Sequence, residues 1–291
     1  MNIDKSLFSP EAQTLIDFLQ SADWPEAAPA FLICQNTEED KTERAEGIIN
    51  YIAENFTNKK FCDFGCGEGH VAREAGKIAG YSIGYDVVKD GTLPWESTEY
   101  DYSLTTDFEK IKQNGPYDII LLYDVLDHVK SPEDVLKQVA SISNANTKIF
   151  VRFHPWIGRH GGHLYKDLNK AWAHLVFTEE ELKLMGIKLQ NVNKCFRPLS
   201  VQKKLFDETG FEIVTSDTIK STVEKFFRRP KIMKRLPLDK FNFEFPEWQM
   251  AQSFNDYVVK LNNPAPAPVE PAPAPVEPAP APVEPAPANP S

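Results

Sequence analysis

The 291-residue chain lacks any apolar run long enough to cross a bilayer, which takes about 20 residues. Its first residues, Met1 to Ser6, also lack the basic and apolar regions of a secretory signal. Both absences favour a cytoplasmic protein without membrane contact. Hydrophobic residues still make up 42% of the sequence, which is enough to bury the core of one large domain or two small ones.

Cysteine is scarce, and Cys34, Cys62, Cys66 and Cys195 are irregularly spaced, which argues against a disulfide framework. Reduced thiols are expected. Cys62, Cys66 and His70 do stand at four-residue intervals, as zinc ligands sometimes do. Because Cys62 falls in an expected strand and Cys66 in a glycine-rich loop, we expect no metal at these residues.

Positive charge is also in short supply, since 32 Lys and Arg face 42 Asp and Glu, for a net charge of −10. General binding to nucleic acid is therefore not expected. A local exception runs from Lys225 to Arg235, where basic side chains gather. Such a run is usually a solvated face, although this one could also meet an anionic substrate.

From Pro264 onward, within the last segment 263–291, the sequence repeats Pro-Ala-Pro-Ala-Pro-Val-Glu. This composition cannot bury a core, and its alternate prolines forbid a helix, so we predict an extended, disordered tail of polyproline II character. Such a tail suits a spacer or a contact with an unknown protein partner better than a catalytic part.

The rest of the chain alternates short apolar runs with stretches of helical periodicity. Alternating strands and helices imply βαβ units around a parallel sheet. The patterns predict helices over 10–20, 41–56, 70–79, 132–142 and 201–208, and strands over 60–64, 81–85, 117–123, 148–153, 211–215 and 253–260.

The strongest local signal is the strand at 60–64, which runs directly into Gly65, Gly67 and Gly69 and then into a helix. Glycines there let the backbone turn tightly and let a ligand approach the peptide groups. Gly67, Gly69 and Ala72 also fit the G-x-G-x-x-A spacing of dinucleotide enzymes, and Asp86 lies about 20 residues further on. An NAD(P)-dependent oxidoreductase therefore stays an alternative.

The charge of this loop favours another ligand. A pyrophosphate would bring about two negative charges close to Asp63 and Glu68. S-adenosylmethionine has no phosphate and carries an ammonium and a sulfonium against one carboxylate. The amides of the loop and the following helix N-terminus can still receive that carboxylate. The balance shifts toward S-adenosylmethionine without excluding NAD.

The segment Asp63-Phe-Gly-Cys-Gly-Glu-Gly resembles motif I of the class I methyltransferases, which use S-adenosylmethionine, and the family's features follow in order. Asp86 matches the acid that holds the ribose hydroxyls, Asp107 loosely matches the acid near the adenine, and 117–129 is similar to the fourth strand and the motif after it. The resemblance covers about residues 45–155, with 202–214 similar to the approach to the sixth strand. It implies that the cofactor is bound by Asp63, Gly65, Cys66, Gly67, Gly69, Asp86, Val87, Asp107, Phe108, Tyr123 and Asp124.

The resemblance also implies the architecture: an α/β fold with a doubly wound, mostly parallel, seven-stranded sheet of Rossmann-like type, its last strand antiparallel. We expect an N-terminal helical extension over 1–44, a methyltransferase domain over 45–262, and the disordered tail over 263–291. Within the domain, a substrate-lid insertion is expected at about 154–200.

Methyl transfer is an in-line displacement, so the enzyme must align the acceptor and, for a hydroxyl, remove its proton. The insertion leaves the carboxyl end of a strand, where open α/β sheets bind ligands, and holds four of the six histidines. Candidate bases are His154 and His163, together with His128 after the fourth strand, although each histidine alone could serve a structural role. Candidate substrate-binding residues are Arg152, Trp156, Arg159, His160 and Tyr165.

The insertion histidines 154, 160 and 163 could also form a metal set, but no carboxylate completes it, so no metal is expected. The sequence after the fourth strand, Asp124-Val-Leu-Asp127, lacks the Pro-Pro-Tyr that nucleobase aminomethylases carry there, which disfavours a nucleobase. We predict an S-adenosylmethionine-dependent methyltransferase for a small, anionic acceptor. The alternatives are the NAD(P)-dependent oxidoreductase and a catalytically silent scaffold that displays the tail.

Overall fold

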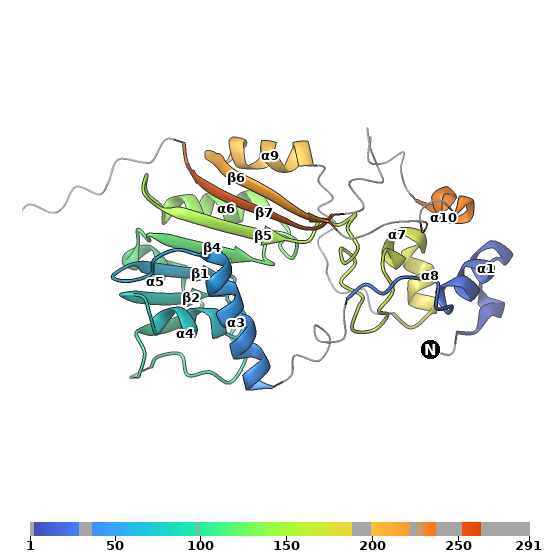
Figure 1. The fold of residues 1–291 in the computed structure, drawn as a ribbon, viewed down its shortest axis with the longest axis horizontal. Coiled ribbons are helices and arrows are strands. Elements are labelled where there is room, and N and C mark those ends of the chain that lie inside the picture. The colour runs from blue at the N-terminus through green and yellow to red at the C-terminus, as the bar shows by residue number, and fades with distance from the viewer. Residues whose placement is uncertain are drawn as a thin grey trace, which may run out of the picture.

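The computed structural model describes residues 3–28, 37–97, 99–187, 199–220, 226, 229–236 and 252–262. Its centre is a seven-stranded sheet with the order β3-β2-β1-β4-β5-β7-β6 (Figure 1). Neighbouring strands are parallel except that β7 runs antiparallel to β5 and β6, so the predicted fold class is confirmed. The strands are β1 (Lys60–Phe64), β2 (Tyr81–Tyr85), β3 (Tyr102–Thr105), β4 (Ile119–Tyr123), β5 (Lys148–Phe153), β6 (Phe211–Lys220) and β7 (Gln252–Leu261).

The central strands are apolar along nearly their whole length because helices cover both faces of the sheet. Successive side chains point to opposite faces, so Phe61 and Cys62 enter different cores. One core lies under α3 (Glu38–Ile52) and α4 (His70–Gly76), and the other lies under α5 (Phe108–Asn114), α6 (Pro132–Ser141) and α9 (Leu199–Glu208).

The helix predicted over 41–56 begins three residues earlier, at Glu38, because Thr37 caps it there. The Ser131 hydroxyl accepts from the Asp134 amide at 3.2 Å, which begins α6 at Pro132 as expected. The short elements β3, α5, α7 (Ala173–Val176), α8 (Glu179–Leu184) and α10 (Pro230–Arg235) were not predicted, because four to seven residues give only a weak period. Among the described residues, no helix is long and apolar enough to span a membrane.

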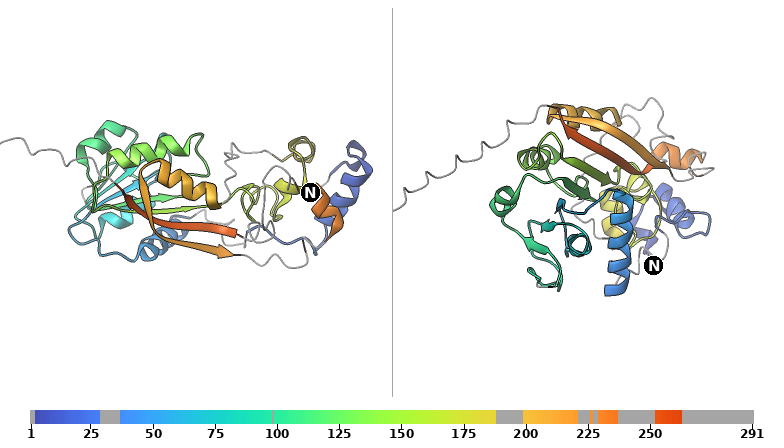
Figure 2. Two further views of the ribbon diagram at one scale, coloured as in Figure 1. Left: turned by 90° about the horizontal axis from the view of Figure 1, so that it is seen from above. Right: turned by 60° about the vertical axis from the view of Figure 1, so that its left-hand side comes forward.

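A separate hydrophobic core lies beyond the end of the sheet (Figures 1 and 2). It joins three segments that are distant in sequence: residues 3–28, residues 157–187, and residues 226 and 229–236, which we together call the cap. Trp24 and Trp172 are buried at its centre, and the Trp24 indole N–H donates to the Ala171 carbonyl at 2.8 Å. The cap contains α1 (Pro10–Leu19), α7 (Ala173–Val176), α8 (Glu179–Leu184) and α10 (Pro230–Arg235).

This packing bears on the predicted domain bounds. The N-terminal helix α1 packs with the insertion after β5, whereas α3, which begins inside the predicted extension, packs on the sheet. We therefore propose a division into a sheet body and the cap, with the break on the N-terminal side falling between residues 28 and 37. The tail at 263–291 lies outside the described residues.

Candidate functional site

A cavity of about 460 Å³ lies at the carboxyl ends of β1 and β4, where α3 and the insertion meet. This is the edge at which open α/β sheets bind ligands. The lining comprises Lys41, Arg44, Ala45 and Ile48 of α3, Asp63 of β1, Gly65, Cys66, Gly67 and Glu68 of the glycine loop, His70 and Val71 of α4, Tyr123 and Asp124 at the end of β4, and His154, His160, Tyr165 and Lys166 of the insertion, together with Ala28 and Asp90.

Two glycines of the loop serve different purposes. Gly65 has φ +82°, and a Cβ there would lie 2.5 Å from Val125 Cγ2, so this position needs glycine for packing. Gly67 has φ +52° and lines the cavity, and a Cβ there would meet no atom within 4 Å among the described residues. The space beside the Gly67 Cα is therefore open to a ligand, while its N–H already donates to Asp86. Gly69 caps α4 against Leu104 and is not part of the lining.

The loop is attached to β2 by its own amides, since Gly65 N–H and Cys66 N–H both donate to the Tyr85 carbonyl, at 2.7 and 3.0 Å. The Asp86 carboxylate accepts from Gly67 N–H at 2.8 Å, which places this predicted ribose-binding acid beside the loop. Val87 follows it and is 77% exposed.

The predicted adenine-side residues stand further off. The Asp107 carboxylate accepts from the Glu109 amide at 2.9 Å and caps α5. The ring of Phe108 packs on Tyr85 with centroids 5.6 Å apart. Of the predicted cofactor residues, the cavity brings together Asp63, Gly65, Cys66, Gly67, Tyr123 and Asp124, and leaves Gly69, Asp86, Val87, Asp107 and Phe108 outside its lining.

The glycine loop carries less negative charge in the structure than Asp63 and Glu68 suggest in the sequence. Burial, with repulsion from Asp86 as a second cause, raises the pKa of Asp63 to about 7, so this carboxyl is partly protonated at neutral pH. Glu68 Oε2 lies 2.5 Å from Lys41 Nζ, so its charge is offset by α3. The loop is thus less acidic than its sequence suggests, and its charge discriminates less between ligands.

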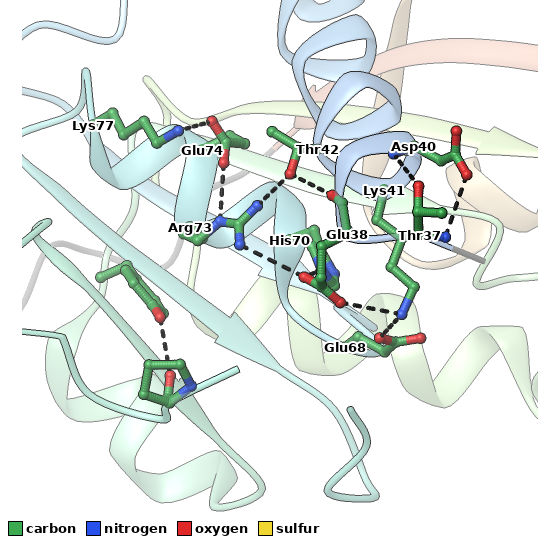
Figure 3. A network of polar contacts seen from close by, with 12 residues as sticks. Thr37, Glu38, Asp40, Lys41, Thr42, Glu68, His70, Arg73, Glu74 and Lys77 are labelled. Carbon is green, nitrogen blue, oxygen red and sulfur yellow. Dashed lines mark hydrogen bonds and ion pairs between the residues drawn. The ribbon is translucent and has the colours of Figure 1, made fainter. Parts of the chain in front are cut away.

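The first turns of α3 are bound to the glycine loop and to α4 by a polar network (Figure 3). The Glu38 carboxylate lies 2.9 Å from His70 Nε2, and hydrogen bonding to this imidazole is the main cause that lowers the pKa of Glu38. The Arg73 guanidinium donates to the Thr42 hydroxyl at 2.7 Å. The sequence predicted this helix from its apolar period, but a row of charges in its first turns does not show that it forms a wall of the cavity.

The three candidate bases gather around one residue that the sequence did not single out, Asp127. Its carboxylate accepts from His154 N–H at 3.2 Å, and its Oδ2 lies 3.2 Å from His163 Nε2 and 3.9 Å from His128 Nε2. Burial opposes ionisation of Asp127, but the hydrogen bonding and charge of the histidines outweigh it and lower its pKa. The only sequence signal for Asp127 as a site residue was its position three residues after Asp124.

Asp124 faces the cavity from the end of β4 with the uncommon backbone φ of +56°. Its Oδ1 lies 3.8 Å from His154 Nε2, and its Oδ2 lies 3.4 Å from Arg44 Nη2. Burial, and then repulsion by Asp127, raises the pKa of Asp124 to about 6. Burial also lowers the pKa of His160 to about 3, so this imidazole is neutral.

Some of the predicted substrate-binding residues line the cavity and others do not. His160 and Tyr165 line the cavity, but Arg152 does not. The Arg152 guanidinium forms a two-pronged ion pair with Asp256, with both N–O distances 2.6 Å, and lies over the Tyr51 ring.

The other predicted cation and aromatic, Arg159 and Trp156, lie in the cap or pack against it. Arg159 donates to the Glu26 carbonyl, and the Trp156 ring packs edge-on to His174. In the basic run, Arg235 pairs with Glu181 at 2.9 Å, while 225, 227 and 228 lie outside the described residues.

Comparison with known proteins gives one family. The family model described as "Methyltransferase domain" matches residues 37–216. The chain is 25% identical over 174 residues to the ubiquinone biosynthesis O-methyltransferase of Aliivibrio fischeri, spanning 56% of this chain and 70% of that protein. It is 27% identical over 173 residues to the enzyme of the same name from Pectobacterium atrosepticum, spanning 55% and 66%.

Solved structures with a similar fold include two methyltransferases. One is an S-adenosylmethionine-dependent methyltransferase from Clostridium acetobutylicum, with a TM-score of 0.45, 12% identity, and coverage of 80% of this chain and 95% of that one. The other is the magnesium protoporphyrin IX methyltransferase of Synechocystis with bound SAH, with a TM-score of 0.43, 13% identity, and coverage of 88% and 97%.

Proposed function

Because the chain belongs to the class I S-adenosylmethionine-dependent methyltransferase family, we propose that it methylates a small-molecule acceptor held in the cavity beside the glycine loop. The observation that carries this proposal is the continuity of the cavity. One space is lined both by Gly65 and Gly67 and by His154 and His160 of the insertion. A ligand on the loop and an acceptor under the histidines would therefore share it.

The residues present fit the family's cofactor. The space beside the Gly67 Cα is open to a ligand, and the Asp86 carboxylate, at the end of β2, accepts from the Gly67 N–H. Asp124 Oδ1 is buried and has no hydrogen-bond partner among the described residues, so it suits a cationic or hydrogen-bond-donating group. We propose Gly65, Gly67, Asp86 and Asp124 as the holding residues. When bound, the cofactor supplies an electrophilic methyl group on a sulfonium.

The sheet argues against the NAD(P) alternative. The usual dinucleotide-binding order is 3-2-1-4-5-6. Here β7 is inserted antiparallel between β5 and β6. The match of this loop to the G-x-G-x-x-A spacing of dinucleotide enzymes is therefore coincidental. The family match favours a methyltransferase over an NAD(P)-dependent enzyme.

We assign the proton-accepting role to His154. It is the only one of the three candidate bases among the lining residues, and its Nε2 faces Asp124 Oδ1 at 3.8 Å. The bond from His154 N–H to Asp127 fixes its backbone. In this arrangement, His154 takes the proton of the acceptor hydroxyl, and the Asp124 carboxylate stabilises the imidazolium that results.

The acceptor must be small, because about 460 Å³ has to hold it together with part of the cofactor. The relatives are named as O-methyltransferases, and a base beside the cavity suits a hydroxyl acceptor, so we propose transfer to oxygen. Lys166 lines the same cavity and suits an anionic acceptor. It replaces Arg152 and Arg159 in that role, because their guanidinium groups are bound to Asp256 and to Glu26.

The test uses the full chain with S-adenosylmethionine carrying a labelled methyl group and the small-molecule fraction of a cell extract. We expect label in a small product, and we expect His154→Gln to lose about 10²- to 10⁴-fold of the rate while it keeps its affinity for S-adenosylhomocysteine. The matched control is His174→Gln, a histidine of the same insertion outside the cavity lining, which should keep the rate. Full activity of His154→Gln would refute its role, and label only in macromolecules would refute the acceptor class.

A further inference from the structure

Three metal-binding side chains from two separate segments converge beside β4. Asp127 and His128 follow the strand, and His163 comes from the insertion. One ligand atom of each lies within 4.8 Å of the others. We propose that Asp127, His128 and His163 bind a divalent transition-metal ion, an inference that does not rest on the proposed methyl transfer although Asp127 also accepts from the His154 backbone N–H.

The spacing suits such an ion. Zinc bonds to histidine nitrogen and carboxylate oxygen are about 2.0–2.2 Å long, so tetrahedral ligand atoms lie about 3.4 Å apart. The Asp127 carboxylate Oδ2 lies 3.2 Å from His163 Nε2 and 3.9 Å from His128 Nε2, on either side of that value. His128 has a side chain 41% exposed, so its ring can make the small remaining adjustment and gives an ion a route from solvent.

A second observation points to a cation at the same place. Among the described residues, Asp127 Oδ1 is a buried atom without a hydrogen-bond partner, and His163 Nε2 is a buried atom that lies 3.2 Å from Asp127 Oδ2 without the geometry of a hydrogen bond. Buried polar atoms are normally satisfied, so two such atoms on adjoining side chains need an explanation. His163 also holds the uncommon φ of +47°, a kind of backbone strain that tends to occur at functional sites. A cation bound to His163 Nε2 and to both oxygens of the Asp127 carboxylate would satisfy both atoms.

The ligand types indicate the class of metal. Two imidazoles and one carboxylate suit zinc and similar transition metals, whereas magnesium and calcium prefer oxygen ligands throughout. Three protein ligands leave a coordination position open, as in catalytic zinc sites. The expectation of no metal was based on a missing carboxylate beside the insertion histidines, and Asp127 supplies that carboxylate from another segment.

A second group with metal-ligand spacing, Glu38, Glu68 and His70, does not support the same proposal. Lys41 Nζ lies 2.5 Å from Glu68 and 3.6 Å from Glu38, so a cation already serves these acids. This group therefore provides a matched control for the Asp127 group.

The experiment titrates Zn²⁺ into the EDTA-treated full chain by calorimetry, and Co²⁺ as a spectroscopic probe of the ligands. We expect one equivalent of Zn²⁺ to bind, to raise the melting temperature, and to resist competition by Mg²⁺. His163→Gln and His128→Gln should each bind Zn²⁺ more than about 100-fold more weakly, because loss of even an outer partner of a ligand typically costs 10- to 100-fold. His70→Gln should bind as the wild type does.

His128 is exposed, so His128→Gln keeps the test decisive even if His163→Gln does not fold. The proposal is overturned if the wild-type chain takes up no Zn²⁺, if His128→Gln binds as tightly as the wild type, or if His70→Gln abolishes binding. None of these measurements uses methyl transfer, so failure of this site and failure of the proposed function remain distinguishable.

Discussion

Replacing Gly67 with alanine should separate ligand binding from folding. The residue lines the cavity with φ +52°, and an added Cβ would have no neighbour within 4 Å among the described residues. The left-handed backbone costs an L-residue about 1–2 kcal/mol, partly offset by the lower entropy of the unfolded alanine chain. We expect Gly67→Ala to lose about 1 kcal/mol of stability, or about 2–4 °C in melting temperature for a domain of this size.

Binding should fall much more than stability. The new methyl group occupies the space through which a ligand approaches Gly67, and overpacking of this kind costs about 1–3 kcal/mol. The affinity for S-adenosylhomocysteine should therefore fall at least about tenfold, which corresponds to about 1.4 kcal/mol. Calorimetry gives the affinity, and a thermal melt of the same sample gives the stability.

Two alanine variants calibrate this result. In Gly65→Ala the Cβ would lie 2.5 Å from Val125 Cγ2, so overpacking adds to the backbone strain and the stability loss should be about 2–5 kcal/mol. Gly47 is exposed in the middle of α3, and Gly47→Ala should stabilise by about 0.5–1 kcal/mol without changing affinity. Affinity within twofold of wild type in Gly67→Ala, or a stability loss as large as in Gly65→Ala, would refute the reasoning.

Three further predictions concern stability. Because the pKa of Asp63 is about 7 in the folded state and about 3.9 when unfolded, the native state binds more protons, so stability should fall by up to about 4 kcal/mol as pH rises from about 4 to 7. Asp63→Asn should flatten that slope in urea titrations across the range. Arg152→Met leaves the buried Asp256 charge unpaired and should cost about 3–5 kcal/mol, and adding Asp256→Asn should recover part of it in the same assay. Trp24→Ala should cost about 3–5 kcal/mol of stability. In this variant a protease should cut the cap before the sheet body, and a cap as resistant to the protease as the sheet body would contradict its dependence on Trp24.

Much of the sheet could be predicted because its signals are local. The apolar run at 119–123 forms β4 itself, and the Ser131 side chain that begins α6 directly precedes that helix. The antiparallel direction of β7 was expected only through the family resemblance, and its position between β5 and β6 was not predicted. The short elements β3, α5, α7, α8 and α10 were not predicted, because their few residues give only a weak period.

The cap could not be predicted, because its core depends on contacts between segments far apart in sequence. Trp24 donates to the carbonyl of Ala171, 147 residues further on. No local sequence pattern in either segment predicts that it will pack against the other. The helical period of 10–20 predicted that α1 exists, but not what it would pack against.

The same limit applies to the site. The carboxyl end of a strand correctly suggested that the glycine loop and the insertion would meet, as they do at the cavity. Charge partners were not visible: Lys41, 27 residues before Glu68, offsets its charge, and Asp256, 104 residues after Arg152, engages its guanidinium. Residue type alone therefore overstated both the acidity of the loop and the number of cations facing an acceptor.

Calorimetry with S-adenosylhomocysteine on the full wild-type chain tests the central claim most directly. The account predicts one equivalent bound at the glycine loop, and a weaker affinity in Asp86→Ala, whose carboxylate now accepts from Gly67 N–H. A wild-type chain that binds no S-adenosylhomocysteine would contradict the assignment of this cavity to methyl transfer.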